Sequence, residues 1–253
     1  MKEYEFVVRE RPQLRDPVLI EGLPGVGNVG KLAADHLIEE LKAVKFADLH
    51  SRHFPPQVLV LPDGTLRLVN NEFYSWKNPH GGQDLVFLIG DYQGLTAEGQ
   101  YVLADAILTF VKELGVKRMF TLGGYGTGQI LEKPRVLGAA TSEDIVADMK
   151  KHGVTFSKDE PGGGIVGASG LLLGLGKLRD MEGVCLMGET SGYLVDPKSA
   201  RAVLEVISKS LGIQVDFAEL ENRAAQMDKL TQQLRDAERQ AEAPGGDDLR
   251  YIG

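Results

Sequence analysis

Short apolar runs alternate along this chain with longer segments of helical periodicity. Residues 17–22 form one such run and lead into a helical pattern at 27–41, and residues 85–90 precede another at 96–114. This alternation is typical of strands and crossover helices in an α/β fold. We therefore predict a three-layer α/β/α sandwich with a mostly parallel central sheet.

Local signals set the expected boundaries. Thr96 is predicted to be an N-cap, and Asp196 with Pro197 is predicted to open a helix, because Asp can cap and Pro fits the first turn. Asp63-Gly64 between two β-rich runs predicts a hairpin. The apolar, glycine-containing segment 166–178 predicts a helix buried on most sides. We expect strands at 17–22, 58–61, 66–69, 85–90, 118–123, 136–140 and 184–188, and helices at 27–41, 96–114, 142–151, 166–178 and 197–211.

Three parts are expected in the chain organisation: an α/β core domain over 1–212, an amphipathic helix over 213–243, and a flexible tail over 244–253. In the helix, apolar residues recur at a three-four spacing with charges between them. Such a helix packs on its own domain or on a sister subunit. We find no internal repeat.

Composition excludes several classes of protein. The formal net charge of -8 comes without a basic stripe, which argues against nucleic-acid binding. Cys185 is the single cysteine, so neither an intramolecular disulfide nor a cysteine-based metal site is expected. The N-terminus does not read as a signal peptide, and no apolar run reaches membrane-spanning length. We expect a cytoplasmic protein without a membrane partner.

The segment Gly25-Val-Gly-Asn-Val-Gly30 matches the G-x-G-x-x-G pattern. It follows an expected strand and opens an expected helix, as in a dinucleotide-binding turn, and Asp48 lies where a ribose-binding acid would fall. The alternative is a strand-to-helix turn that needs glycine for close packing. Residues 41–54 are too polar and too rich in histidine to predict a second parallel strand with assurance. The candidate ligand residues here are Gly25, Gly27, Asn28 and Gly30.

A second glycine-rich segment, Gly123 to Gly128, follows the strand expected at 118–123. Gly124, Tyr125, Gly126 and Thr127 could cradle an anion, or could let a neighbouring subunit approach. It is not a P-loop, because Gln129 and Ile130 stand where Lys and Ser or Thr would be. Asp91 ends a strand, where α/β proteins place functional groups, although a carboxylate there is also a common loop anchor.

Catalytic and metal-binding signals are weak. The histidines show no metal-ligand spacing on one helix. No Gly-x-Ser-x-Gly elbow is present, and we find no nucleophile–base pair. We therefore assign no catalytic residue, metal or cofactor, and an enzyme is the less favoured interpretation.

Three segments together resemble the archaeal proteasome assembly chaperone family: Val18 to Gly30, Thr121 to Gly128, and Gly163 to Leu172. Each is a weak signal alone, but their order and spacing are fairly specific, and the resemblance covers residues 15 to 215. It implies an α/β sandwich domain that forms homo-oligomers and helps proteasome α subunits assemble. The family has at times been labelled an ATP-grasp or carboligase relative.

Some members of that family carry a C-terminal hydrophobic–tyrosine–any motif that docks between α subunits. Here a Pro-Gly-Gly break at 244–246 precedes the tail Asp247 to Gly253. Tyr251 is third from the end rather than penultimate, and Arg250 precedes it where an apolar residue would stand. A frayed terminus is the alternative. The expected partner-binding residues are Leu249, Arg250, Tyr251, Ile252 and Gly253.

These signals lead to one prediction and one alternative. We predict a homo-oligomeric, proteasome assembly chaperone-like protein that binds proteasome α subunits or the core particle through its C-terminal tail. The alternative is an ATP- or other nucleotide-binding enzyme of the ATP-grasp or carboligase type that uses the Gly25–Gly30 loop. Subunit number does not follow from the sequence.

Overall fold

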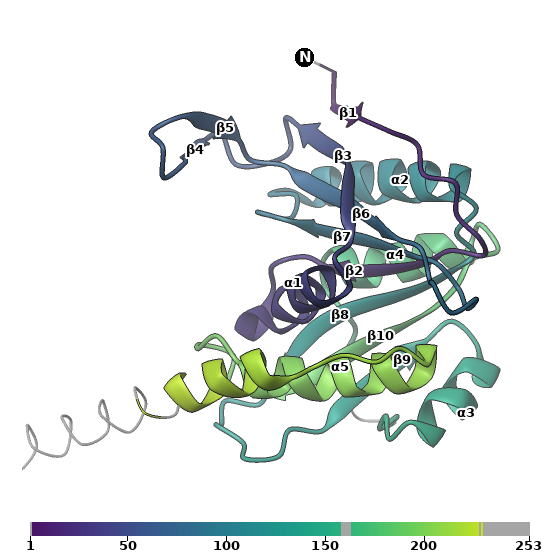
Figure 1. Ribbon diagram of the computed structural model, residues 1–253, viewed down its shortest axis with the longest axis vertical. Coiled ribbons are helices and arrows are strands. Elements are labelled where there is room, and N and C mark those ends of the chain that lie inside the picture. The colour runs from purple at the N-terminus through teal and green to yellow at the C-terminus, as the bar shows by residue number, and fades with distance from the viewer. Residues whose placement is uncertain (1, 158–162, 228, 230–253) are drawn as a thin grey trace, which may run out of the picture.

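The computed structural model describes residues 2–157, 163–227 and 229. Within them, an eight-stranded mixed sheet has the order β1-β3-β6-β7-β2-β8-β10-β9, and β4 and β5 form a separate two-stranded sheet (Figure 1). The strands are β1 (Tyr4–Val8), β2 (Val18–Gly22), β3 (Val44–Ser51), β4 (Val58–Val60), β5 (Leu66–Leu68), β6 (Asn71–Trp76), β7 (Leu85–Gly90), β8 (Arg118–Gly126), β9 (Val136–Ala140) and β10 (Glu182–Thr190).

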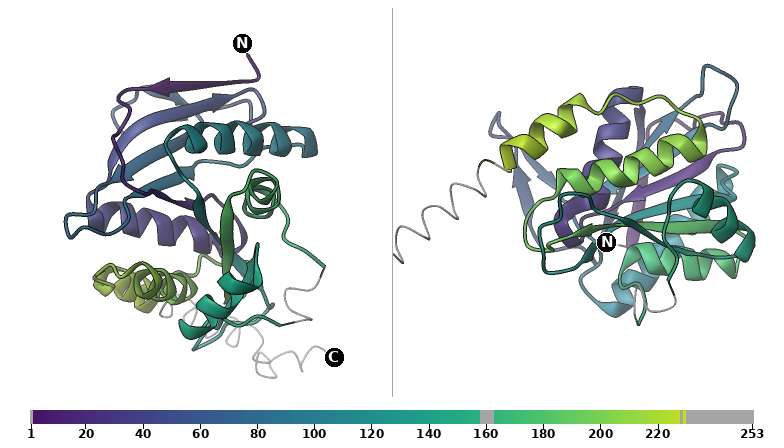
Figure 2. Two further views of the ribbon diagram at one scale, coloured as in Figure 1. Left: turned by 90° about the vertical axis from the view of Figure 1, so that its right-hand side faces the viewer. Right: turned by 90° about the horizontal axis from the view of Figure 1, so that it is seen from below.

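Helices cover both faces of the sheet, as the three-layer prediction requires (Figure 2). One face packs against α1, α5 and α3, and the other against α2 and α4. The helices are α1 (Val29–Leu41), α2 (Ala97–Glu113), α3 (Glu143–Lys151), α4 (Ala168–Lys177) and α5 (Pro197–Leu211), with a short 3-10 turn, η1 (Val26–Asn28), before α1.

The parallel part of the sheet is its centre. β7, β2, β8 and β10 run parallel to one another, and their apolar residues alternate between the two helical layers. Ile20 of β2 packs with α1 and α5, whereas its neighbour Leu19 packs with α2. β1, β3, β6 and β9 are antiparallel additions at the two edges.

Most of the expected elements are present with their predicted signals. The side chains of Thr96, Ser142 and Asp196 accept hydrogen bonds from backbone amides in the first turns of α2, α3 and α5 respectively. These bonds satisfy backbone donors that have no partner inside a helix. Val58–Val60 and Leu66–Leu68 pair as the predicted hairpin.

Three expectations need correction. β8 continues through Gly126 instead of ending at Gly123, because Gly124 and Gly126 pair with β10. The helix expected at 166–178 spans Ala168–Lys177, and the residues flanking it, Val166 and Leu178, are exposed, because α4 buries only the side facing α2 and the sheet. The polar segment within 41–54 forms β3, an antiparallel strand between β1 and β6.

The chain returns to the domain after α5. Phe217 packs against the α1–α5 layer, Leu220 is buried in it, and the backbone carbonyl of Asp216 lies 2.6 Å from His36 Nε2. Helical backbone begins at residue 218, five residues after the start of the helix expected over 213–243, and is described as far as 227. The remainder of the helix expected over 213–243, and the whole tail, lie outside the described residues.

Close packing of α1 on the sheet gives a stability prediction. A Cβ on Gly30 would lie 2.2 Å from the Leu122 carbonyl oxygen, whereas a Cβ on Gly174 in α4 would meet nothing within 4 Å. We expect Gly30→Ala to lower the free energy of unfolding by about 1–3 kcal/mol, because backbone must move. The matched Gly174→Ala should be neutral or raise it by up to about 1 kcal/mol. Urea unfolding at one protein concentration measures both, and equal effects would contradict the packing argument.

Candidate functional site

The two glycine-rich segments singled out in the sequence meet at the carboxyl end of the sheet. The turn that contains Gly25 packs against the ends of β8 and β10. A Cβ on Gly124 would lie 2.2 Å from the Val26 carbonyl oxygen, and one on Gly27 would lie 2.7 Å from Thr190 Oγ1. The structure therefore brings these residues together through direct backbone packing.

Backbone conformation and hydrogen bonding hold this turn in place. Gly27 and Asn28 are both left-handed, with φ of 62° and 53°. The Gly27 carbonyl accepts a hydrogen bond of 2.9 Å from the amide of Asp196, at the start of α5. Gly27 is packed against the Thr190 side chain and Gly30 against the Leu122 carbonyl, whereas Gly25 and Val26 are exposed. At Gly27 and Gly30 the geometry therefore favours the close-packing interpretation over a phosphate cradle.

Strand order also weighs against a dinucleotide site. In such folds the strand that carries the ribose-binding acid lies beside the first strand. Asp48 is on β3, which β6 and β7 separate from β2. Its buried carboxylate already bonds Arg9 at 3.0 Å, Lys45 at 2.6 Å and Asn70 at 2.6 Å.

Gly124, Tyr125 and Gly126 belong to β8 and pair with Gly188, Glu189 and Thr190 of β10. The Thr127 amide donates to the Thr190 carbonyl at 2.8 Å, and the Thr127 hydroxyl donates to the same oxygen at 3.1 Å. Together with the close approach of Val26, this favours packing over anion binding for the second segment.

Asp91 follows β7 and has a defined partner in the hairpin. Its carboxylate accepts two hydrogen bonds from the Arg67 guanidinium, at 2.6 and 2.8 Å, and a third from the Asn70 amide at 3.1 Å. Burial alone would raise the pKa of Asp91, but the Arg67 and Asn70 bonds outweigh it and lower the pKa below its ordinary value. The loop-anchor interpretation of Asp91 fits this geometry.

Sequence reasoning missed a polar cluster beneath the glycine turn. Glu21 is fully buried on β2 and faces the layer of α2 and α4. Its carboxylate accepts hydrogen bonds from the Leu23 amide at 3.0 Å and the Ser169 hydroxyl at 2.9 Å. Beside it, Gln93 donates to the Pro24 carbonyl and accepts from the Ala168 amide, both at 2.9 Å. A glutamate inside an apolar run was the available signal.

Burial dominates the electrostatics of Glu21. It raises the pKa of the carboxyl to about 7, against the opposing effect of the bonds from Leu23, Ser169 and Leu122. The thiol of Cys185 lies in the same layer, and burial raises its pKa to about 12. The cluster therefore ties the start of α4 to β2 with a carboxyl that changes protonation near neutral pH.

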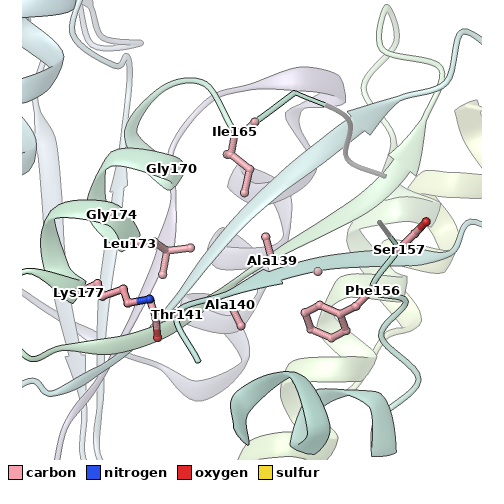
Figure 3. A pocket seen from close by; sticks show the side chains of 12 residues that line it. Ala139, Ala140, Thr141, Phe156, Ser157, Ile165, Gly170, Leu173, Gly174 and Lys177 are labelled. Carbon is pink, nitrogen blue, oxygen red and sulfur yellow. The ribbon is translucent and has the colours of Figure 1, made fainter. Parts of the chain in front are cut away.

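An apolar groove of about 520 Å³ lies between β9 and α4 (Figure 3). Ala139 and Ala140 line it on one side, Leu173 and Ile165 on the other, and Phe156 closes one end, as the close-up shows. Lys177 places an ammonium group at its rim.

Among residues 2–157, 163–227 and 229, no group of three His, Cys, Asp or Glu side chains is placed to hold a metal ion. In that same part of the chain, none of the helices combines the length and the apolar character needed to cross a bilayer. Leu249, Arg250, Tyr251, Ile252 and Gly253, the predicted partner-binding residues, fall outside it.

The raised pKa of Glu21 predicts the pH dependence of stability. Between about pH 4.5 and pH 7 the folded protein keeps a proton that the unfolded chain has lost, so stability falls as pH rises through this window and levels off above it. Over this window, Glu21 alone lowers the free energy of unfolding by about 3 kcal/mol. Glu21→Gln should therefore be stabilised relative to the parent at about pH 8 but not at about pH 4.

Urea unfolding across this pH range measures the effect. Glu182→Gln, an exposed glutamate at the start of β10, is the control and should follow the parent profile. A Glu21→Gln profile parallel to the parent would mean that Glu21 titrates alike in the folded and unfolded chains.

Comparison with known proteins places this fold among proteasome-related structures. Pyrococcus furiosus PbaB, described as an archaeal proteasome activator, is 46% identical with a TM-score of 0.89, and the match covers 93% of this chain and 100% of that one. Pyrococcus furiosus PbaA, described as an archaeal homolog of proteasome-assembly chaperone, is 28% identical with a TM-score of 0.73, over 94% and 99% of the two chains.

A sequence relative and a family profile agree with these structures. An uncharacterized protein of Methanocaldococcus jannaschii is 43% identical over 252 residues, which is 97% of this chain and 96% of that one. The profile of the PAC2 family matches residues 19–235, which include β3 to β10, all but the first residue of β2, and all five named helices. The chain is thus a member of the PAC2 family, which confirms the resemblance to archaeal proteasome assembly chaperones.

Proposed function

We propose that this protein is a homo-oligomeric, proteasome assembly chaperone-like protein that binds proteasome α subunits or the core particle through its C-terminal tail. The observation that carries the proposal is its similarity, over nearly the whole of both chains, to a protein described as an archaeal proteasome activator. Similarity to a homolog of proteasome-assembly chaperone supports the same class of partner. Both α subunits and the finished core particle are therefore candidate partners.

The tail is the proposed contact. Leu249, Tyr251 and Ile252 offer apolar and aromatic surface, and Gly253 ends the segment. Aromatic anchors dominate many protein interfaces, and terminal carboxylates are captured by partner pockets. Asp247 and Asp248 favour a pocket with a basic rim, and Arg250 replaces the apolar residue of the family motif.

Several tails on one oligomer would act together. A single short peptide binds weakly, but linked copies raise the effective affinity by roughly 100-fold or more when their spacing matches the partner sites. Packing of Phe217 and Leu220 against the α1–α5 layer supports this, because it fixes the point where the C-terminal helix leaves the domain. On this mechanism the domain positions the tails and the tails bind.

The alternative, a nucleotide-binding enzyme, has less support. The Gly25–Gly30 turn does join β2 to α1, as a phosphate-binding turn would. However, Leu122 is packed against Gly30 and Thr190 against Gly27, and Val26 of the same turn is packed against Gly124 of β8. The carboxylate of Asp48 is already paired with Arg9. Thermal unfolding with millimolar ATP or NAD separates the two, since a bound nucleotide raises the melting temperature.

The tail proposal predicts a simple loss of binding. Deleting Leu249 to Gly253 should reduce capture of purified α subunits and core particle at least 10-fold, because removal of every tail also removes avidity. The oligomer and the unfolding midpoint should not change. Pull-down with the full-length and truncated proteins, together with their sedimentation, measures this.

A matched control keeps the tail length. Leu249→Ala, Tyr251→Ala and Ile252→Ala combined should bind as poorly as the deletion, whereas Asp247→Asn alone should keep most of the binding. Equal capture by full-length and truncated protein would contradict the tail mechanism.

A further inference from the structure

The hairpin of β4 and β5 projects from the body of the domain (Figure 1). Val58 lies opposite Leu68 and Val60 opposite Leu66, so alternation along the strands places all four side chains on one face. They are between 47% and 70% exposed. We call this the hairpin face. An exposed apolar face on an ordered hairpin is typical of a protein–protein interaction surface.

The opposite side of the hairpin is fastened to the domain. Leu59 packs against the core cluster beside α2, and Arg67 lies across from it. The Arg67 guanidinium holds Asp91 with two hydrogen bonds and donates to Asn70 Oδ1 at 3.1 Å. This attachment holds the apolar side chains outward.

A groove of about 520 Å³ adjoins the hairpin face. Val58 and Leu68 belong to both, so the two surfaces are continuous. The groove also carries a buried phenylalanine and two prolines, which give it an apolar lining. We call it the hairpin groove; its apolar residues are Phe54, Pro55, Pro56, Val58, Leu68 and Val69.

We propose that this surface joins two copies of the chain, with the hairpin face of each copy seated in the hairpin groove of the other. A face and a groove of matching apolar character that lie side by side on one molecule are self-complementary, which a two-fold interface requires. The proposal rests on the oligomer of the proposed function and names its contact surface.

Charge supports a second copy as the occupant. With a net charge of -8 on each chain, two copies repel unless they meet through a neutral surface. Here the hairpin's Arg67 is paired with Asp91, and Arg52 at the groove is paired with Glu3 at 2.9 Å. Asp63, in the exposed turn, accepts a hydrogen bond from the Thr65 amide and keeps its charge. Apart from this turn carboxylate, the surface offers apolar groups and the two paired arginines.

The area required also favours reciprocal seating. A stable interface buries roughly 800 Å² on each partner. A single apolar patch on a monomer usually spans only roughly 300–600 Å². When each copy contributes both a face and a groove, each partner buries the area of both surfaces together, which brings a modest apolar patch closer to the area of a stable interface.

The first test changes the hairpin face without touching the core. Val60→Glu with Leu66→Glu places like charges in the proposed contact, so the variant should lose at least half of the parent's mass in sedimentation. Val44→Glu with Leu178→Glu is the matched control, because those side chains are 67% and 82% exposed elsewhere, and it should keep the parent mass.

The second test locates the contact. Cys185 is buried and its pKa is about 12, so introduced thiols are the reactive ones. A short bis-maleimide should join Leu66→Cys protein to Pro56→Cys protein in a mixture. Thr109→Cys, on the exposed side of α2, should not be joined to Pro56→Cys.

Three outcomes would overturn the proposal: a monomeric parent, a hairpin variant that keeps its mass, or the absence of Leu66–Pro56 cross-links. A hairpin variant that keeps its mass but no longer captures core particle would assign the face to the proteasome and so also overturn it. The tail deletion fails or succeeds independently, because it removes no residue of the hairpin face or groove.

Discussion

Contact between backbone and backbone at the carboxyl end of the sheet is the constraint on which the rest of the domain depends. Gly30 lies against the Leu122 carbonyl, Gly124 against the Val26 carbonyl, and Gly22 against the Gly30 carbonyl. Any side chain at these positions would push α1 away from β2 and β8, and α5 packs on α1 in turn. A phosphate-binding turn uses the same residue type but keeps open space in front of it. The glycine pattern is shared by both, and only the surroundings distinguish them.

On the face of the sheet covered by α2 and α4, polar side chains help to hold α4 in place. α4 is short and rich in glycine, and it packs on the core through buried Leu172 and Leu173. Its first turn is also held by Ser169, which bonds Glu21, and by the Ala168 amide, which bonds Gln93. A buried carboxyl that titrates near neutrality is a costly means of attachment. Its cost is smallest when the carboxyl is protonated, so this attachment is pH-dependent by construction.

The sequence predicted the central strands, the helices with their caps and the hairpin, because periodicity and capping are local signals. β1, β3 and β6 were missed because polar residues in this part of the sheet are buried against distant partners: Asp48 of β3 bonds Arg9 and Asn70, and Glu72 of β6 bonds Lys45. Gly124 was predicted to lie in a loop, because a glycine is needed there to make room for Val26 of the neighbouring turn and not for its own strand. Asp91 could be singled out from its place at the end of a strand, but its partner Arg67 could not, because their contact depends on how distant segments pack.

Charge separates the two contacts proposed for this protein. A chain of net charge -8 meets its own copies through a surface whose arginines are already paired, since any excess charge there would be repeated on both sides of a two-fold interface. The tail proposed to bind the proteasome begins with two unneutralised acidic residues, Asp247 and Asp248. On the proposed mechanism, this charge would be repelled by other copies of the acidic chain and attracted to a basic pocket on a different protein. Neutral apolar contacts for self-association and acidic tails for the partner would then keep the two proposed binding events from competing.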